Sequence, residues 1–146
     1  MRDAACIAEG LREADRAELR AAGYRDEIHR LAIERSIAVS VHAWTAEVNG
    51  RPGVVFGVRA EGDTLFSQVG IPWALGTDAV TANRRALVVL PPGYIREMLR
   101  AFPTLTNYVH AENTQAIRWL KRAGFVIERA APNAYGAMFH RFTMGV

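Results

Sequence analysis

The chain has few of the residues on which several classes of protein depend. Cys6 is its only cysteine, so no disulfide can form within the chain, which is typical of a reducing compartment. Lys121 is the only lysine among 18 basic residues, and the basic residues are interleaved with acidic ones instead of being clustered. A nucleic-acid-binding face needs such clustering. With a formal net charge of only +3, we expect no nucleic acid partner.

Long apolar runs are also missing. No stretch reaches the roughly 18 apolar residues that cross a bilayer, and no run of signal-peptide length precedes Glu9 and Glu13. The four histidines do not have the spacing of a metal site. We therefore expect no membrane segment, no signal peptide and no metal. A composition of 50% hydrophobic and 23% charged residues is that of a globular chain, which predicts one domain over residues 1–146.

The first half of the chain has the pattern of two helices followed by three strands. Asn49-Gly50 predicts a tight hairpin turn between the first two strands. Charges alternate along both helices, which predicts solvated outer faces. Gly70–Asp78 has no clear pattern and is interpreted as a loop in which Trp73 is exposed. The predicted helices are Ile7–Ala22 and a second one from Asp26 to about Ile37, and the predicted strands are Val39–Val48, Gly53–Arg59 and Thr64–Val69.

The segment from Asn107 to Phe125 has the clearest signals for where its strand and helix begin and end. A short apolar strand, Tyr108–Ala111, is followed by Asn113, which can cap a helix. Apolar residues then recur at helical spacing, and Gly124 can take the positive φ that ends a helix. The other expected elements are a helix from Thr77 or Asp78 through Val88, a helix over Gly93–Phe102, and strands over Val126–Arg129 and Gly136–Thr143.

This unit resembles the C-terminal half of the GNAT family of N-acetyltransferases, whose pattern is Asn-x-x-Ala-x-x-x-Tyr-x-x-x-Gly-Phe. Asn113, Ala116, Gly124 and Phe125 match that pattern in register. The resemblance implies an α+β fold in which helices flank a central, mostly antiparallel mixed sheet. It also implies that the helix after Asn113 lies beside the pantetheine arm of acetyl-CoA. The family's tyrosine often protonates the departing thiolate of CoA, but Leu120 stands in its place and cannot donate a proton.

The phosphate-binding loop of that family, Gln/Arg-x-x-Gly-x-Gly/Ala, has no match between Phe66 and Leu90. A substitute is conceivable, because residues 76–78 precede a predicted helix whose N-terminus could receive an anion. The simpler interpretation is a plain helix cap with solvated arginines, and Asn113 is likewise interpreted as a cap. If acetyl-CoA is bound, the expected contacts are Gly76, Thr77, Arg84, Arg85 and Asn113; otherwise no cofactor is expected.

No catalytic residue is assigned from the sequence. Glu47, Glu61 and Glu112 are candidate general bases only if a substrate cleft exists beside them. There is no Gly-x-Ser-x-Gly elbow, and Cys6 has no local signature of a nucleophile.

Several short phrases also resemble a narrower group, the acetyltransferase-like proteins of tailed phages, including the small internal virion protein of T7-like podophages. Three of these phrases are Pro72–Asp78, Ile117–Leu120 and Phe139–Met144. This resemblance implies a catalytically degenerate protein that acts in virion structure or assembly, through contacts with other virion proteins, in the virion or the host cytoplasm. The alternatives are a working N-acetyltransferase with a non-standard CoA site and an inhibitor of a host protein.

Overall fold

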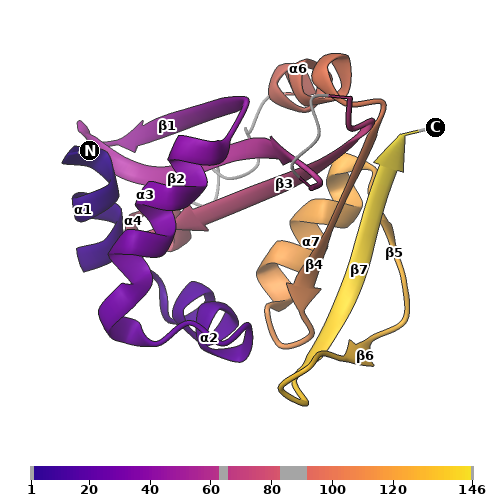
Figure 1. Ribbon diagram of the computed structural model, residues 1–146. Helices are drawn as coiled ribbons and strands as arrows, with labels where there is room; N and C mark the ends of the chain where they lie inside the picture. The colour runs from indigo at the N-terminus through magenta and orange to yellow at the C-terminus, as the bar shows by residue number, and fades with distance from the viewer. Residues whose placement is uncertain (1, 63–65, 83–91, 146) are drawn as a thin grey trace.

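The computed structural model describes residues 2–62, 66–82 and 92–145 and is built on one mixed sheet (Figure 1). The helices are α1 (Arg2–Glu9), α2 (Glu13–Ala21), η1 (Asp26–Ile28), α3 (His29–Val39), α4 (Asp78–Ala82), α6 (Pro92–Ala101) and α7 (Thr114–Ala123). The strands are β1 (His42–Val48), β2 (Arg51–Ala60), β3 (Val69–Gly76), β4 (Thr104–His110), β5 (Val126–Ile127), β6 (Ala131–Pro132) and β7 (Met138–Gly145).

The strands lie in the order β1-β2-β3-β4-β7-β5, and β6 pairs with β7. Among the described strands, β3 and β4 are the one parallel pair, and the other pairs are antiparallel. The expected α+β architecture, a mostly antiparallel mixed sheet flanked by helices, is confirmed.

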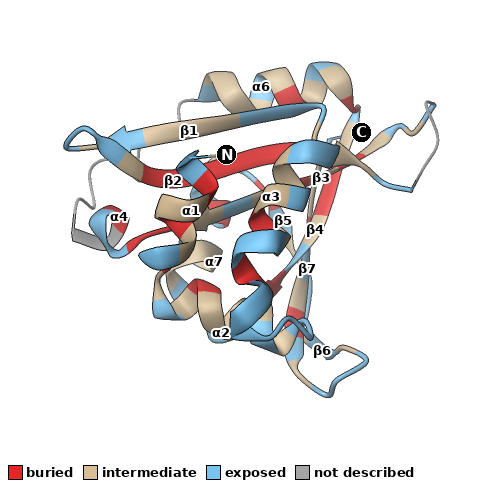
Figure 2. Ribbon diagram, turned by 60° about the vertical axis from the view of Figure 1, so that its left-hand side comes forward, coloured by how far each residue is buried: buried red, intermediate tan, exposed pale blue. Residues whose placement is uncertain are grey.

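Helices cover both faces of the sheet, and β2 is buried between them (Figure 2). Successive side chains of a strand point to opposite faces. Val55 accordingly packs with Ile7 of α1 and Ile33 of α3, whereas Phe56 belongs to the cluster that includes Leu120 of α7. The protein therefore has two apolar clusters, one on each side of the sheet.

Local signals define the β1–β2 turn and α7 as predicted. Asn49 and Gly50 have φ values of 53° and 76°, the two positive angles of a tight hairpin turn. Asn113 caps α7, because its side chain accepts a hydrogen bond from the N–H of Ala116. Gly124 follows the helix with φ of 101°, a conformation that favours glycine.

The predicted helix Ile7–Ala22 is wrong as a single element. It is broken at residues 10–12, between α1 and α2. Leu11 forms a β-bridge with Thr77, and the N–H of Arg12 donates to the carbonyl of Gly76 at 2.9 Å. The end of β3 therefore competes for the backbone groups that a continuous helix would use, and the chain turns at Gly10.

The third strand was predicted in the wrong place. β3 occupies Val69–Gly76, which was interpreted as a loop, whereas residues 66–68 are not strand. Gly70, Pro72 and Gly76 look like strand breakers, yet all three lie within β3. A side chain at Gly70 would collide with Phe102, since a Cβ there would lie 2.6 Å from its ring. Residues 63–65, like Arg84, Arg85 and Val88, lie outside the described residues.

The ends of several helices and strands also differ by a few residues from the predictions. α3 continues to Val39, so β1 begins only at His42, and β4 begins at Thr104, ahead of the predicted Tyr108. Asp26 does not cap α3 but pairs with Arg20 across the loop at 2.6 Å. None of the helices in the described ranges is long and apolar enough to cross a membrane.

Candidate active site

The two central strands separate soon after they meet. β3 and β4 are paired at Val69 with Thr104 and at Gly70 with Leu105, and beyond this point they diverge (Figure 1). The N–H of Thr104 donates to the carbonyl of Gln68, so every second residue of β3 from there on directs its backbone groups toward β4. Pro72 is one of these, and it has no N–H to donate. The parallel ladder therefore cannot continue past it.

Asn107 bridges the strands where they part. Its Nδ2 donates to the carbonyl of Pro72 at 2.7 Å, and its Oδ1 accepts from the N–H of Tyr108 at 2.8 Å. The side-chain amide of Asn107 thus replaces a backbone hydrogen bond between the strands and fixes the narrow end of the gap between β3 and β4.

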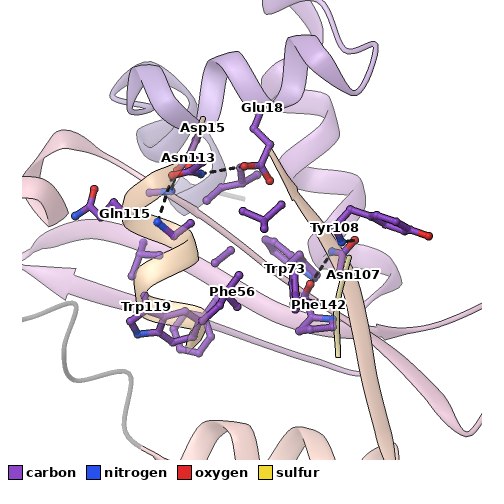
Figure 3. Close-up of a pocket in the computed structure, with 18 of the residues that line it drawn as sticks. Asp15, Glu18, Phe56, Trp73, Asn107, Tyr108, Asn113, Gln115, Trp119 and Phe142 are labelled. Atoms are coloured by element: carbon purple, nitrogen blue, oxygen red, sulfur yellow. Dashed lines mark hydrogen bonds between the residues drawn. The ribbon is translucent and has the colours of Figure 1, made fainter. Parts of the chain in front are cut away.

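A cavity of about 270 Å³ lies at this gap (Figure 3). Its described lining comes from both helical layers and from the two diverging strands, and it is mostly apolar. It therefore reaches from one layer to the other through the gap in the sheet. Lining residues include Glu18, Leu19 and Ser36 from one layer, Tyr94, Met98, Trp119 and Leu120 from the other, and Trp73, Ala74 and Tyr108 from the strands.

Helix α2 closes the wide end of the gap with a buried ion pair. Arg12 contacts Asp15 through two hydrogen bonds, of 2.6 and 3.0 Å, and both side chains are largely shielded from solvent. Asp15 also accepts the N–H of Gly76 at the end of β3, at 2.8 Å, while Arg12 donates to Gln115 on α7, at 3.0 Å. The predicted solvated face is wrong here, because Asp15 is only 4% exposed.

Glu18 lies one turn after Asp15 and also faces the cavity. Its Oε2 accepts a hydrogen bond of 2.9 Å from Nδ2 of Asn113 (Figure 3). Burial raises the pKa of Glu18 to about 7, against the opposing effect of the Asn113 hydrogen bond. The charge of Asp15 adds to the rise, and that of Arg12 opposes it. Glu18 is therefore a carboxyl that can gain or lose a proton near neutral pH.

Sequence reasoning missed Glu18. The available signal was weak: Asp15 and Glu18 are three apart and so share one face of a helix. Their long-range partners, Gly76 for Asp15 and Asn113 for Glu18, are 61 and 95 residues away in the chain. The candidate bases named from sequence, Glu47, Glu61 and Glu112, are all exposed, and none of them is among the residues that line this cavity.

The predicted cofactor contacts are only partly brought together. Asn113 and Gly76 line the cavity. Thr77 is buried beside β2 instead, where its N–H and its hydroxyl both bond the carbonyl of Gly53. Arg84 and Arg85 lie outside the described residues. Trp73, predicted in an exposed loop, is half-buried in β3 and lines the cavity.

Leu120 also lines the cavity, at 6% exposure, from the side of α7. It occupies the position at which the GNAT pattern has tyrosine, so α7 presents an apolar side chain there. Within the part of the chain that the structure describes, no group of three or more histidine, cysteine or acidic side chains could hold a metal ion.

Comparison with solved structures identifies the fold. The aminoglycoside acetyltransferase AAC(6')-Ib in complex with coenzyme A aligns at TM-score 0.69 and 17% identity, over 99% of this chain and 90% of that chain. RimL, a ribosomal-protein α-N-acetyltransferase in complex with coenzyme A, aligns at TM-score 0.65 and 7% identity, over 99% and 85%. A GNAT-family acetyltransferase from Streptococcus pneumoniae aligns at TM-score 0.57 and 15% identity, over 84% and 77%.

No protein-family model and no curated protein matches the sequence. At these identities the structural likeness establishes the fold, which is that of the GNAT acetyltransferases.

Proposed function

We propose that this protein is an acetyl-CoA-dependent N-acetyltransferase with a non-standard cofactor site, in which Glu18 is the general base. The observation that carries this proposal is the Glu18 carboxyl in the cavity between β3 and β4, where Asn113 holds it at 2.9 Å and burial raises its pKa to about 7. An ammonium group must lose a proton before its nitrogen can attack a thioester. A base whose pKa lies close to the working pH is best suited to remove it.

The backbone edge of β3 supplies a surface for the pantetheine arm. The N–H of Thr77 pairs with Gly53 of β2, so the alternation of an antiparallel ladder directs the N–H and C=O of Ala74 away from β2 and into the gap. Ala74 is exposed and lines the cavity. Pantetheine carries amide groups that match such an edge.

The resemblance to GNAT proteins implies that α7 lies beside the pantetheine, so the side of α6 and α7 would hold the cofactor. The amine would then approach from the side of α2 and α3. That two of the solved neighbours named above are complexes with coenzyme A supports cofactor binding by this fold.

The residues of this chain would act in the following way. When bound, acetyl-CoA supplies the acetyl thioester that the amine attacks. Glu18 accepts the proton that the amine releases, and Asn113 orients the Glu18 carboxylate through its 2.9 Å hydrogen bond. Leu120 cannot return a proton to the leaving thiolate, so water in the open cavity must do so. Positioning of the two reactants supplies much of the remaining rate enhancement.

A second candidate function rests on Leu120. Without a proton donor at that position, the protein could be a catalytically degenerate member of the fold that acts in phage virion structure or assembly. Its partners would then be other virion proteins or a host protein. This candidate predicts stable association with such a protein and no acetyl transfer.

Thermal unfolding with and without acetyl-CoA, followed by an assay for release of free thiol, separates the two. A ligand at about 100 times its dissociation constant stabilises the native state by roughly 2.7 kcal/mol. For a chain of this length each kcal/mol raises the unfolding midpoint by about 2–4 °C, so the midpoint should rise by roughly 5–11 °C. We expect this shift and measurable transfer to an amine. A folded sample that shows neither would reject the enzyme and leave the virion role.

A further inference from the structure

We infer that the acceptor is a small monoamine with an apolar or aromatic body, whose ammonium group lies beside Glu18 and whose body packs against Trp73. This inference rests on the proposed function, because it assigns the α2 and α3 side of the cavity to the acceptor. Figure 3 shows Glu18, Trp73 and Tyr108 around the same cavity.

Trp73 is held in place as an apolar wall. Its indole N–H donates to Oγ of Ser40 at 2.8 Å, and that hydroxyl in turn donates to the carbonyl of Ser36 at 2.7 Å. The one polar atom of the indole is thereby occupied, so the ring meets the cavity with carbon atoms. Because its orientation is fixed before any ligand arrives, little side-chain entropy is lost on binding.

Gly57 on β2 makes room for this ring. A Cβ at Gly57 would lie 3.2 Å from Cζ2 of Trp73 and 2.5 Å from the carbonyl oxygen of His42. Any larger residue there would displace β1 or the indole. On the same side of the cavity, Leu19 of α2 and Leu75 of β3 extend the apolar surface around Trp73.

The charges around the cavity admit one ammonium group. Among the described residues that line it, the acids are Asp15 and Glu18. Asp15 is already satisfied by Arg12 and by the N–H of Gly76. Glu18 has neutral partners, the side-chain amide of Asn113 and a backbone hydrogen bond from His110, and it forms no ion pair among the described residues. A polyamine, an aminoglycoside or a basic peptide would bring further ammonium groups that find no carboxylate there, which is costly in a mostly apolar site.

The aromatic wall suits the same ligand. An apolar or aromatic body that packs against the indole gains free energy from leaving water. A single amine on such a body places its one charge at Glu18 and its carbon atoms at Trp73.

The test is a panel of acceptors assayed with acetyl-CoA on the full chain. The probes are 2-phenylethylamine and hexylamine against spermidine, kanamycin and a lysine-containing basic peptide. We expect kcat/KM for 2-phenylethylamine to exceed that for each polycation by at least about tenfold, the discrimination that a single apolar contact can provide.

Variants of Trp73 show whether the ring makes the contact. Trp73→Ala should raise KM for 2-phenylethylamine about tenfold, leaving KM for acetyl-CoA and kcat nearly unchanged, and Trp73→Phe should restore most of the loss. Trp44→Phe is the matched control, because Trp44 packs in the other apolar cluster and is not among the cavity-lining residues that the structure describes. If Trp73→Ala does not fold, Leu19→Ala carries the same comparison, because Leu19 lines the cavity beside Trp73.

The outcomes separate the inference from the function on which it rests. Preferred transfer to kanamycin, spermidine or the peptide would overturn the inference and leave the acetyltransferase in place. Equal KM values for 2-phenylethylamine in the wild type and in Trp73→Ala would overturn it as well. No transfer to any amine, together with no stabilisation by acetyl-CoA, would overturn both.

Discussion

Helices α2 and α7 border the same cavity, but they are stabilised in different ways. Helix α7 is defined by its own sequence, with the cap at Asn113, the apolar residue Leu120 turned inward and the stop at Gly124. Helix α2 buries Asp15 and directs it, together with Glu18, into the cavity. Burying a charged side chain is costly unless it is paired. In the proposed function, α2 supplies the general base, whereas α7 supplies the side on which the cofactor would lie and the cap, Asn113, that orients that base.

The largest expected effect is that of Asp15→Ala. It would leave Arg12 shielded from solvent without its partner and free the N–H of Gly76, and breaking a buried pair in this way typically costs about 3–5 kcal/mol. Urea unfolding would measure the change. Asp26→Ala, which removes an exposed ion pair with Arg20, should cost far less, because solvent screens such a pair. Equal losses in the free energy of unfolding for Asp15→Ala and Asp26→Ala would show that the buried acid of α2 stabilises the fold no more than an exposed acid does.

Glu18→Gln should lower kcat for acetyl transfer by about 10²- to 10⁴-fold, the usual contribution of a general base. The amide keeps the size of the side chain, so folding and stabilisation by acetyl-CoA should persist. Glu13→Gln is the matched control, since Glu13 lies on the same helix with its side chain 74% exposed. A loss of activity of the same size in both variants would assign the effect to the helix and not to Glu18.

Stability should depend on pH through Glu18. The folded protein keeps this proton up to about pH 7, whereas the unfolded chain releases it near pH 4.5. The folded state thus binds more protons in this window, so the free energy of unfolding falls as the pH rises. The contribution is at most about 3 kcal/mol, and less to the extent that solvent reaches the carboxylate. Glu18→Gln should remove this part of the slope in urea titrations between pH 4.5 and 7; an unchanged slope would contradict it.

Asn113→Ala should have the smallest effect. It removes the cap of α7, which costs about 1 kcal/mol, and it takes away the side-chain donor that favours the ionised form of Glu18. The acid limb of the pH–rate profile should therefore move to higher pH. Thr114→Ala, at the exposed neighbouring position, is the control and should move neither quantity. If the acid limb of the pH–rate profile lies at the same pH in Asn113→Ala as in the wild type, Asn113 acts only as the cap of α7.

Much of the fold could be predicted from local signals. Asn49-Gly50 and the segment from Asn113 to Gly124 each determine their own backbone conformation, so the hairpin and α7 were predicted correctly. The strand β3 was not, because Pro72 looks like a breaker unless one knows that its nitrogen faces a gap where no hydrogen bond is needed.

The site was harder to predict than the fold. The acids of α2 look like surface charges until β3 and α7, which lie far away in the sequence, are placed beside them. Of the predicted contacts, Asn113 and Gly76 lie at the cavity because they sit where a helix and a strand end against the gap. Thr77, the very next residue after Gly76, points to β2 instead, and only the register of β3 against β2 determines which of the two faces the gap.

The most direct test of the central claim is the pH dependence of kcat/KM for acetyl transfer, measured for the wild type and Glu18→Gln with saturating acetyl-CoA. If Glu18 is the base, the wild-type rate should rise through an apparent pKa near 7, and this limb should be absent from the variant. The same limb in Glu18→Gln, or no acetyl transfer by the folded wild type at any pH, would contradict the assignment.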